Sequence, residues 1–185
     1  SVGQIALGMD VRIVDDEDVE VDNGTIGEII FRGPAMMRGY WRAEAATQEV
    51  LKDGWMHSGD LGYRDQDGFF YVTDRKKDMI VSGGENVYPR EVEDVLYAHP
   101  DVIEAAVIGV PDEKWGERVH ALLVPKGDTE LDPEEVIQFA RQKLAGYKVP
   151  KTAELKTELP KNALGKILKS ELRKPYWEGR DRSVS

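Results

Sequence analysis

The segment LPKNALGKILKSEL, residues 159–172, contains the side chain best suited to charge chemistry. Lys166 directly follows Gly165 in what reads as an exposed turn. A glycine at that point permits positive φ or a close approach of the backbone to a ligand. The lysine offers a compact, mobile positive charge for a carboxylate or a phosphate. Taken alone, a lysine after a turn glycine is more often merely solvated, so Lys166 gains weight only from motifs upstream.

The segment GWMHSGDLGYRDQDGFFYVTDR, residues 54–75, offers a candidate sugar-binding pair. Asp60 carries two acceptor oxygens, which can receive hydrogen bonds from both cis hydroxyls of a ribose. Arg75 lies fifteen positions later and can donate to the same sugar or to a phosphate. Each residue by itself is better explained by an ordinary role, a turn-stabilising aspartate or a surface ion pair.

A glycine turn follows at Ser82-Gly83-Gly84-Glu85. Two adjacent glycines leave room for a narrow part of a ligand, although a Gly-Gly pair more often forms a plain tight turn. The following residues 86–93 join that turn to a helix start in a fixed way. Glu91 and Glu93 are most simply acids of the first helical turn, which the helix dipole favours.

Composition narrows the function classes. The chain has 185 residues, enough for one large or two small domains, with 35 Asp plus Glu against 25 Lys plus Arg and a net charge of −10. This acidity argues against nucleic acid or an anionic membrane as the main partner. The absence of cysteine excludes disulfides and thiol chemistry and is compatible with a cytoplasmic location. Three scattered histidines show no zinc-ligand spacing, so we expect no metal site.

No targeting or membrane segment is recognisable. No apolar run approaches the length of about 18 residues that a membrane span needs. The opening residues, SVGQIALGMD, lack the basic end and apolar core of a signal peptide, and they read as sequence from the middle of a fold. We therefore expect the chain to be a fragment of a longer protein.

The elements that must position these residues fall into two parts. The first part, residues 1–76, is rich in strand patterns and contains one short helix at residues 43–51. Asn23-Gly24 is a hairpin signal between an expected strand at 19–22 and one at 27–33, and Asp67-Gly68 is turn chemistry between two strand-like runs. The remaining expected strands cover residues 11–15, 61–64 and 69–74.

The composition changes at the charge cluster RKKD, residues 75–78, and we place a domain boundary near Lys77. Beyond it the pattern is mixed, so the predicted fold class is α+β with domains 1–76 and 77–185. Pro89 and Asp132-Pro133 mark two helix starts, and Gly146 is expected to stop the second helix. Strands are expected at 102–110, 119–124 and 153–156, a last helix at 168–174, and a loose tail at 178–185.

At this point the sequence resembles the adenylate-forming superfamily of acyl-CoA synthetases, firefly luciferases and peptide-synthetase adenylation domains. GEIIFRGPAMMRGYW is similar to the family's Gly-Glu strand and Gly-Tyr-Trp turn. Residues 54–93 resemble its ribose-binding aspartate, hinge and glycine turn, and LPKNALGK resembles its catalytic lysine loop. The resemblance implies the β-barrel-like end of a large AMP-binding domain followed by a small, mobile C-terminal domain.

The resemblance implies roles for three residues around the boundary. Asp60 matches the aspartate that binds the ribose hydroxyls of ATP and of the acyl-adenylate, and Arg75 matches the arginine that assists it. Lys77 matches the hinge. A family enzyme also carries an upstream phosphate loop and an aromatic-Gly-x-Thr-Glu stretch for adenine and Mg²⁺, and neither occurs here. We therefore expect the magnesium site to lie mostly outside this chain and the isolated chain to be inactive.

The resemblance also implies two sites in the second part. The glycine turn, Gly83 and Gly84 with Glu85, matches the turn that faces the coenzyme A channel. Lys166 matches the catalytic lysine that bridges the substrate carboxylate and the nucleotide during adenylation, where a cation between two anions lowers the barrier. Some relatives carry a second lysine before the glycine turn, but Val81 stands there in this chain.

These features together predict the C-terminal part of an AMP-forming acid:CoA ligase. It would use ATP, coenzyme A and a carboxylic acid, with fatty acids favoured, and it would work with the missing N-terminal domain. One alternative is a ligase that loads a carrier protein. Another is a non-catalytic module that binds a nucleotide or a partner, which the missing upstream motifs favour for the isolated chain. The sequence identifies neither the acid nor the oligomeric state.

Overall fold

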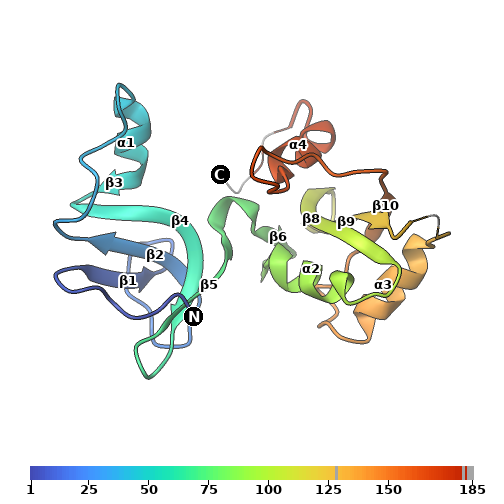
Figure 1. Cartoon of the computed structure of the whole chain (residues 1–185), viewed down its shortest axis with the longest axis horizontal. Helices are drawn as coiled ribbons and strands as arrows, with labels where there is room; N and C mark the ends of the chain where they lie inside the picture. Colours follow the sequence, from blue (N-terminus) through green and yellow to red (C-terminus); the bar gives the residue numbers. More distant parts are fainter. Residues whose placement is uncertain (128, 181, 183–185) are drawn as a thin grey trace. The chain divides into compact units, whose positions relative to one another are not determined.

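The computed structural model describes residues 1–127, 129–180 and 182, and it divides the chain into two compact units, Ser1–Lys76 and Lys77–Ser185 (Figure 1). Each unit contains one sheet; the first unit has one short α-helix among its described residues and the second has three. The strand-rich, mixed architecture confirms the predicted α+β class. No helix among the described residues is long and apolar enough to cross a lipid bilayer.

The first unit is built on an antiparallel sheet in the order β1-β2-β4-β3, with β5 paired to β4. Its buried apolar side chains include Ile13, Val14, Ile30, Leu61 and Phe70. The sheet's elements are β1 (Asp10–Val14), β2 (Gly27–Arg32), β3 (Leu51–Lys52), β4 (Trp55–Arg64) and β5 (Phe70–Arg75), with the helix α1 (Glu44–Val50) before β3.

The expected strand at residues 19–22, and with it the hairpin around Asn23-Gly24, is wrong. The strand β1 pairs directly with β2, and the segment between them contributes only an isolated bridge between Val14 and Glu20. The Asp15 carboxylate accepts hydrogen bonds from the backbone of Glu17 and Val19, which closes a turn where the sequence pattern suggested a second strand. Local side-chain hydrogen bonding of this kind competes with sheet pairing.

The expected strand at 61–64 is the end of a longer strand, β4, which begins at Trp55. The polar, glycine-containing residues 58–60 hide this continuity in the sequence. Pairing with β2, in which Ile30 lies opposite His57, keeps them in the sheet, and the ladder with β5 has a register shift at Leu61 and Gly62. Tertiary pairing therefore overrides the weak strand propensity of this segment.

The second unit has a sheet in the order β10-β9-β6-β7, with β8 paired to β9 and β10 parallel to β9. The strand β9 is central, because it pairs with β8, with β10 and, at one residue, with β6. The strands are β6 (Ile80–Ser82), β7 (Glu85–Val87), β8 (Val102–Asp112), β9 (Gly116–Pro125) and β10 (Thr152–Leu155); the helices are α2 (Pro89–Tyr97), α3 (Pro133–Arg141) and α4 (Lys169–Arg173), with 3-10 turns η1 (Lys76–Asp78) and η2 (Lys174–Tyr176).

Both faces of this second sheet are buried. Val107 and its neighbours on one face pack against α2 and α3, through Leu96 and Val136. Ile108 and its neighbours on the other face pack against the C-terminal segment, through Leu159 and Leu172. The helices α2 and α3 accordingly lie on one side of β8 and β9, and α4 lies on the other (Figure 1). This two-sided burial explains why β8 reads as a continuous apolar run.

The predicted helix starts are confirmed. Pro89 and Pro133 open their helices, and the Asp132 carboxylate accepts the backbone N–H of Glu134 at 2.9 Å. The second helix ends at Arg141, before the predicted stop at Gly146, because the chain continues in tighter turns after it. In the tail, Arg182 is anchored by polar contacts, contrary to the expectation that this segment is loose; residues 181 and 183–185 lie outside the described part.

Candidate nucleotide and catalytic-loop sites

The two candidate nucleotide residues meet at one end of the first sheet. Asp60 and Arg75 are register partners across β4 and β5, and Arg75 Nε lies 2.7 Å from Asp60 Oδ1. Both side chains are partly exposed. The Ser58 hydroxyl fixes this part of β4, since it accepts the Asp60 backbone N–H at 3.0 Å and donates to the Ile29 carbonyl at 2.6 Å. The arrangement presents a carboxylate held in place by a cation, which suits a vicinal diol.

A buried glutamate, Glu28, holds the same part of β4 by accepting a backbone hydrogen bond. Glu28 on β2 accepts the Gly59 backbone N–H at 3.1 Å with one oxygen. Its other oxygen lies 3.2 Å from Lys76 Nζ and 3.3 Å from His57 Nδ1. Burial by itself would raise the pKa of Glu28, but the hydrogen bonds from Gly59, Lys76 and His57 outweigh it and lower that pKa. A charged Glu28 thus ties the residue before Asp60 to Lys76.

Sequence reasoning missed Glu28 as a functional residue. The available signal was a glutamate at the start of an otherwise apolar strand, GEIIF. Such a residue has to face solvent or find a partner, because an unpaired buried charge is costly. Its partners Lys76 and His57 lie 48 and 29 positions away, so the sequence alone gives no means to choose them.

Lys77 lies in the 3-10 turn η1, where the second unit begins. Its side chain is exposed, whereas the next three residues, Asp78, Met79 and Ile80, are buried. The chain therefore passes from solvent into the core of the second unit at this residue. Its proposed action as a hinge remains a prediction.

The glycine turn is a two-residue hairpin loop between β6 and β7. Gly83 and Gly84 have φ values of 63° and 85°, and both central residues of a type I′ turn require such positive values. The Trp115 ring also packs against Gly83, where an added Cβ would lie 2.6 Å from a ring carbon. Glu85 begins β7 with an exposed side chain. Hairpin geometry and this packing account for the glycines, and the channel role stays a prediction.

Hydrogen bonds hold the backbone of the loop around Lys166, and its charged side chain is exposed. The Asn162 side chain accepts the backbone N–H groups of Leu164 and Lys166 at 3.0 and 2.9 Å, and Asn162 and Lys166 also pair through their backbones. Gly165 has a φ of 80°, as its place in the turn requires. The Lys166 side chain is exposed, and across the described part of the chain its ammonium forms no ion pair. The backbone is thus ordered while the charge is available to a ligand.

The predicted residues are distributed over both units. Asp60 and Arg75 belong to the first unit and contact each other; the residues of the second unit are Lys77, Gly83, Gly84, Glu85 and Lys166. Within the described residues no group of three or more His, Cys, Asp or Glu side chains could hold a metal ion.

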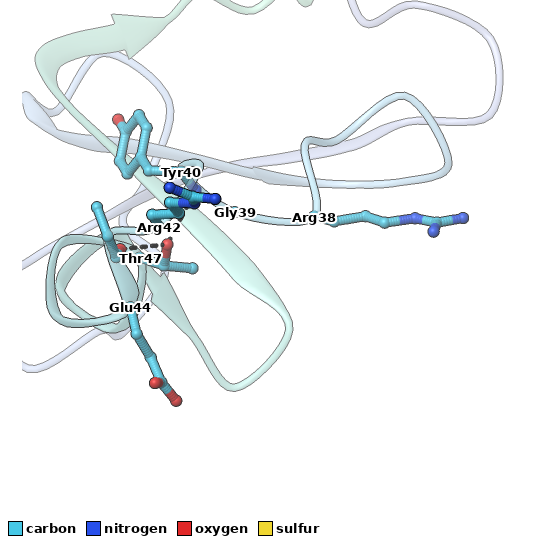
Figure 2. Close-up of a pocket in the computed structure, with 7 residues that line it drawn as sticks. Arg38, Gly39, Tyr40, Arg42, Glu44 and Thr47 are labelled. Atoms are coloured by element: carbon cyan, nitrogen blue, oxygen red, sulfur yellow. Dashed lines mark hydrogen bonds between the residues drawn. The ribbon is translucent and has the colours of Figure 1, made fainter.

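The first unit also has a polar pocket that is lined by neither Asp60 nor Arg75. In Figure 2 the side chains of Arg38 and Glu44 point away from Thr47, which is itself held by the Tyr40 N–H and the Ala43 carbonyl. No predicted site residue lines this pocket, and its arginines do not converge on a common point, so we assign it no ligand. Its lining consists of Arg38, Gly39, Tyr40, Arg42, Ala43, Glu44 and Thr47.

Two family models match the chain. The model described as AMP-binding enzyme matches residues 1–41, and the model described as AMP-binding enzyme C-terminal domain matches residues 91–166. The matched ranges lie on either side of the segment that holds Asp60, Arg75 and Lys77.

Curated relatives cover nearly the whole chain. A feruloyl-CoA synthase from Amycolatopsis sp. is 49% identical over 176 residues, which are 95% of this chain and 36% of that protein. A long-chain-fatty-acid–CoA ligase from Yersinia pestis is 50% identical over 173 residues, which are 94% of this chain and 31% of that protein. The chain thus spans about a third of the length of the curated relatives it matches.

Solved structures agree in fold. MatB from Rhodopseudomonas palustris with ATP bound superimposes with a TM-score of 0.87 at 37% identity, over 95% of this chain and 35% of that one. The o-succinylbenzoate-CoA synthetase MenE from Bacillus subtilis, with its acyl-adenylate intermediate, gives 0.82 at 38% identity, over 97% and 35%. The amide bond synthetase McbA from Marinactinospora thermotolerans gives 0.83 at 39% identity, over 95% and 36%.

Proposed function

Because this chain belongs to the AMP-binding enzyme family, we propose that it forms the C-terminal part of an AMP-forming acid:CoA ligase. The observation that carries the proposal is the similarity to CoA ligases along 95% of the chain, an extent that must include Asp60, Arg75 and Lys166 together. Each of these residues has an ordinary explanation by itself. Their joint occurrence in one chain that is similar to CoA ligases over its length supports the specific chemistry.

In the first step a carboxylate oxygen of the acid attacks the α-phosphorus of ATP. The new oxygen–phosphorus bond replaces the bond to the β-phosphate, and pyrophosphate leaves with its electron pair. Asp60 accepts hydrogen bonds from the ribose hydroxyls, and Arg75 holds the Asp60 carboxylate in position. Lys166 lies between the two anions, where its charge reduces their repulsion and stabilises the charge that develops in the transition state.

In the second step the coenzyme A thiol releases its proton to solvent and its sulfur attacks the acyl carbon. The carbon–oxygen bond to AMP breaks, and AMP leaves with the bonding electron pair. This step needs a different set of groups around the same adenylate, so we propose that the small unit turns about Lys77 between the steps. The turn would withdraw Lys166 and bring the hairpin of Gly83, Gly84 and Glu85 to the path of the pantetheine arm. The exposed position of Lys77, next to the buried Asp78, supports a pivot at this residue.

Magnesium would accompany ATP and neutralise its phosphates. The described residues of this chain supply no cluster of ligands for it. We therefore assign none of them to the metal.

For the acid we propose a fatty acid, and an aromatic acid is the second candidate. The names of the curated relatives support both, because they include long-chain-fatty-acid–CoA ligases and feruloyl-CoA synthases. The acceptor also has a second candidate. The similar structure of an amide bond synthetase favours testing acceptors other than coenzyme A, a carrier-protein thiol and an amine among them.

The test uses a protein of full family length that carries this chain. It is incubated with ATP, magnesium and a panel of fatty and aromatic acids, and acyl-AMP and pyrophosphate are measured by mass spectrometry and a coupled assay. Coenzyme A, a phosphopantetheinylated carrier protein and an amine are then offered separately. We expect adenylate with at least one acid and rapid conversion with coenzyme A. Adenylate without any thioester would refute the CoA ligase, and no adenylate with any acid would refute the whole proposal.

The isolated 185-residue chain provides a control that shows whether residues outside it are required for ATP turnover. Since it contains no phosphate loop, we expect no pyrophosphate release with ATP, magnesium and a fatty acid. Binding of AMP without turnover would instead indicate a non-catalytic nucleotide-binding module. Turnover by the isolated chain would show that all the essential groups are already present in it.

A further inference from the structure

Two arginines from the C-terminal end of the chain hold the turn that follows the unit boundary. Arg173 on α4 donates to the Asp78 carboxylate at 2.7 Å, and both side chains are buried. Arg182 donates to the carbonyl oxygens of Lys77 and Met79 at 2.6 and 2.7 Å. The first three residues of the second unit are therefore all hydrogen-bonded to the two arginines: Asp78 through its side chain, and Lys77 and Met79 through their backbone carbonyls.

Arg182 is itself fixed by a buried carboxylate. Its Nε and Nη2 atoms lie 2.6 and 3.1 Å from the two oxygens of Glu117 on β9, which is only 2% exposed. A forked arginine–carboxylate pair of this kind has a defined geometry as well as strength. Glu117 also accepts the backbone N–H of Val81, so the same carboxylate orients the arginine and the chain just beyond the turn.

The surrounding fold makes room for this arrangement. Gly109 on β8 lies against Glu117, and a Cβ there would be 2.4 Å from a carboxylate oxygen. The Gly109 carbonyl accepts the indole N–H of Trp177 at 3.0 Å, which anchors the chain between the two arginines. Gly109 thus leaves space for the Glu117 carboxylate, and Trp177 holds the C-terminal segment against β8. Both contacts help to bring the tail back to residues 77–79.

The consequence concerns where the chain can turn. The carbonyl of Lys77 belongs to the planar peptide that joins it to Asp78. Arg182 holds this carbonyl and Arg173 holds the Asp78 side chain, so the peptide plane moves with the second unit. Any rotation of the preceding chain must then use the φ and ψ angles of Lys77 or of earlier residues.

We propose that Arg173, Arg182, Asp78 and Glu117 form a C-terminal clasp that excludes the residues after Lys77 from the pivot, so that the small unit turns at Lys77 or at residues before it. Arg173 and Arg182 are positioning residues in this account. The helix α4, which carries Arg173, directly follows the Lys166 loop, so the clasp also ties that loop to the pivot. The pivot role rests on the domain rotation in the proposed function, whereas the clasp itself can be tested without it.

The first test is hydrogen exchange on the 185-residue chain. Arg182→Gln removes the charge and the fork, and we expect exchange in residues 77–81 to accelerate about tenfold or more, as for the loss of charge-assisted hydrogen bonds. Arg180→Gln is the matched control, because that arginine is exposed and lies two residues earlier. Unchanged exchange in Arg182→Gln would overturn the clasp. Arg182→Lys keeps the charge without the fork and should be intermediate, so it serves if the glutamine variant does not fold.

The second test uses a protein of full family length. It asks whether the clasp limits where the chain can turn or only stabilises the fold. Lys77→Pro stiffens the pivot and should slow thioester formation from supplied acyl-AMP. If the clasp keeps the next residues from turning, adding Arg182→Gln should restore thioester formation severalfold, while adding Arg180→Gln should not. A double variant as slow as Lys77→Pro, or slower, would overturn the pivot role even if hydrogen exchange confirmed the clasp. Failure of the wild type to form any adenylate would instead count against the proposed function, with the exchange result still standing.

Discussion

Asp60 and Arg75 lie directly opposite each other on β4 and β5, with Arg75 Nε 2.7 Å from Asp60 Oδ1. The pair is partly exposed, so its contribution to folding is small, on the order of 1 kcal/mol or less. We therefore expect the pair to orient a carboxylate for a ligand rather than to stabilise the sheet. This separation of roles makes the pair testable by comparing affinity with stability.

Asp60→Asn in a protein of full family length should weaken ATP binding about tenfold or more, since charge-assisted hydrogen bonds to the ribose are worth roughly 1.5–3 kcal/mol each. Affinity for the acid and the urea midpoint should change little. Isothermal titration with ATP measures the effect, and Asp67→Asn in the neighbouring turn is the control. An unchanged ATP affinity would remove Asp60 from the nucleotide site.

Lys166→Ala should slow adenylate formation on the order of 10²-fold or more, as for the removal of an electrostatic stabiliser. Thioester formation from supplied acyl-AMP should stay close to the wild-type rate, because the loop is expected to leave the site before that step. The two half-reactions are measured separately by quenched flow. Lys161→Ala, in the same loop but paired with Glu104, is the control. Equal losses in both half-reactions would mean that Lys166 supports the fold or a shared site.

Lys77→Pro should leave adenylate formation nearly intact and strongly reduce thioester formation. Proline fixes φ and also restricts Lys76 before it, so the chain loses freedom at the proposed pivot. Single-turnover measurements of both steps test this, with Lys77→Ala as a control that keeps backbone freedom. Wild-type rates in both steps for the proline variant would show that the pivot lies elsewhere.

Glu28→Gln should destabilise the first unit by about 1–3 kcal/mol near neutral pH, because Gly59, Lys76 and His57 lose a charged acceptor in a buried setting. The folded pKa of Glu28 is lowered, so its stabilisation is present above the unfolded value of about 4.3 and is lost as the pH falls below it. Urea unfolding at several pH values should therefore show a difference from wild type that shrinks in acid.

Glu20→Gln is the matched control for Glu28, because its ion pairs with Arg12 and Arg64 are solvent-exposed. We expect it to change stability by less than about 1 kcal/mol. A Glu28→Gln protein as stable as wild type at neutral pH would show that the buried carboxylate is not held in its charged form.

His120 should make the second unit sensitive to mild acid. It is buried against Thr152 and Tyr176, and burial is the main cause that lowers its pKa. The unfolded chain then binds the extra proton more readily, so stability is fully present above about pH 6.5 and falls as the pH drops through that value. Urea midpoints between pH 8 and 5.5 should fall in the wild type and fall less in His120→Gln. An equal fall in His120→Gln and in the wild type would show that another group causes the acid sensitivity.

Tyr176 should make the second unit lose stability at high pH. Burial and the hydrogen bond to Glu154 raise its pKa to about 12. The unfolded tyrosine ionises near pH 10, so stability should decline as the pH rises from about 10 towards 12. Tyr176→Phe should reduce that decline, which a urea titration at pH 9 and 11 can resolve.

The sequence by itself determined the features that depend on neighbouring residues. Asp132 followed by Pro133 specifies a helix start, and the glycines at 83 and 84 specify a turn with two positive φ values. The motifs also marked Asp60, Arg75 and Lys166 as candidates and indicated the family. Backbone propensity and capping act over a few residues, so such features can be read directly.

Only the tertiary structure decided which distant residues meet. Arg173 contacts Asp78 across 95 positions and Arg182 contacts Glu117 across 65, although the composition of the tail suggested a loose end. The buried role of Glu28 likewise depends on partners from β4 and from the start of η1. Ion pairs and strand registers are chosen by the packing of the whole unit, since many carboxylates and cations are equally suitable partners in the sequence, and only burial next to one of them selects the pair.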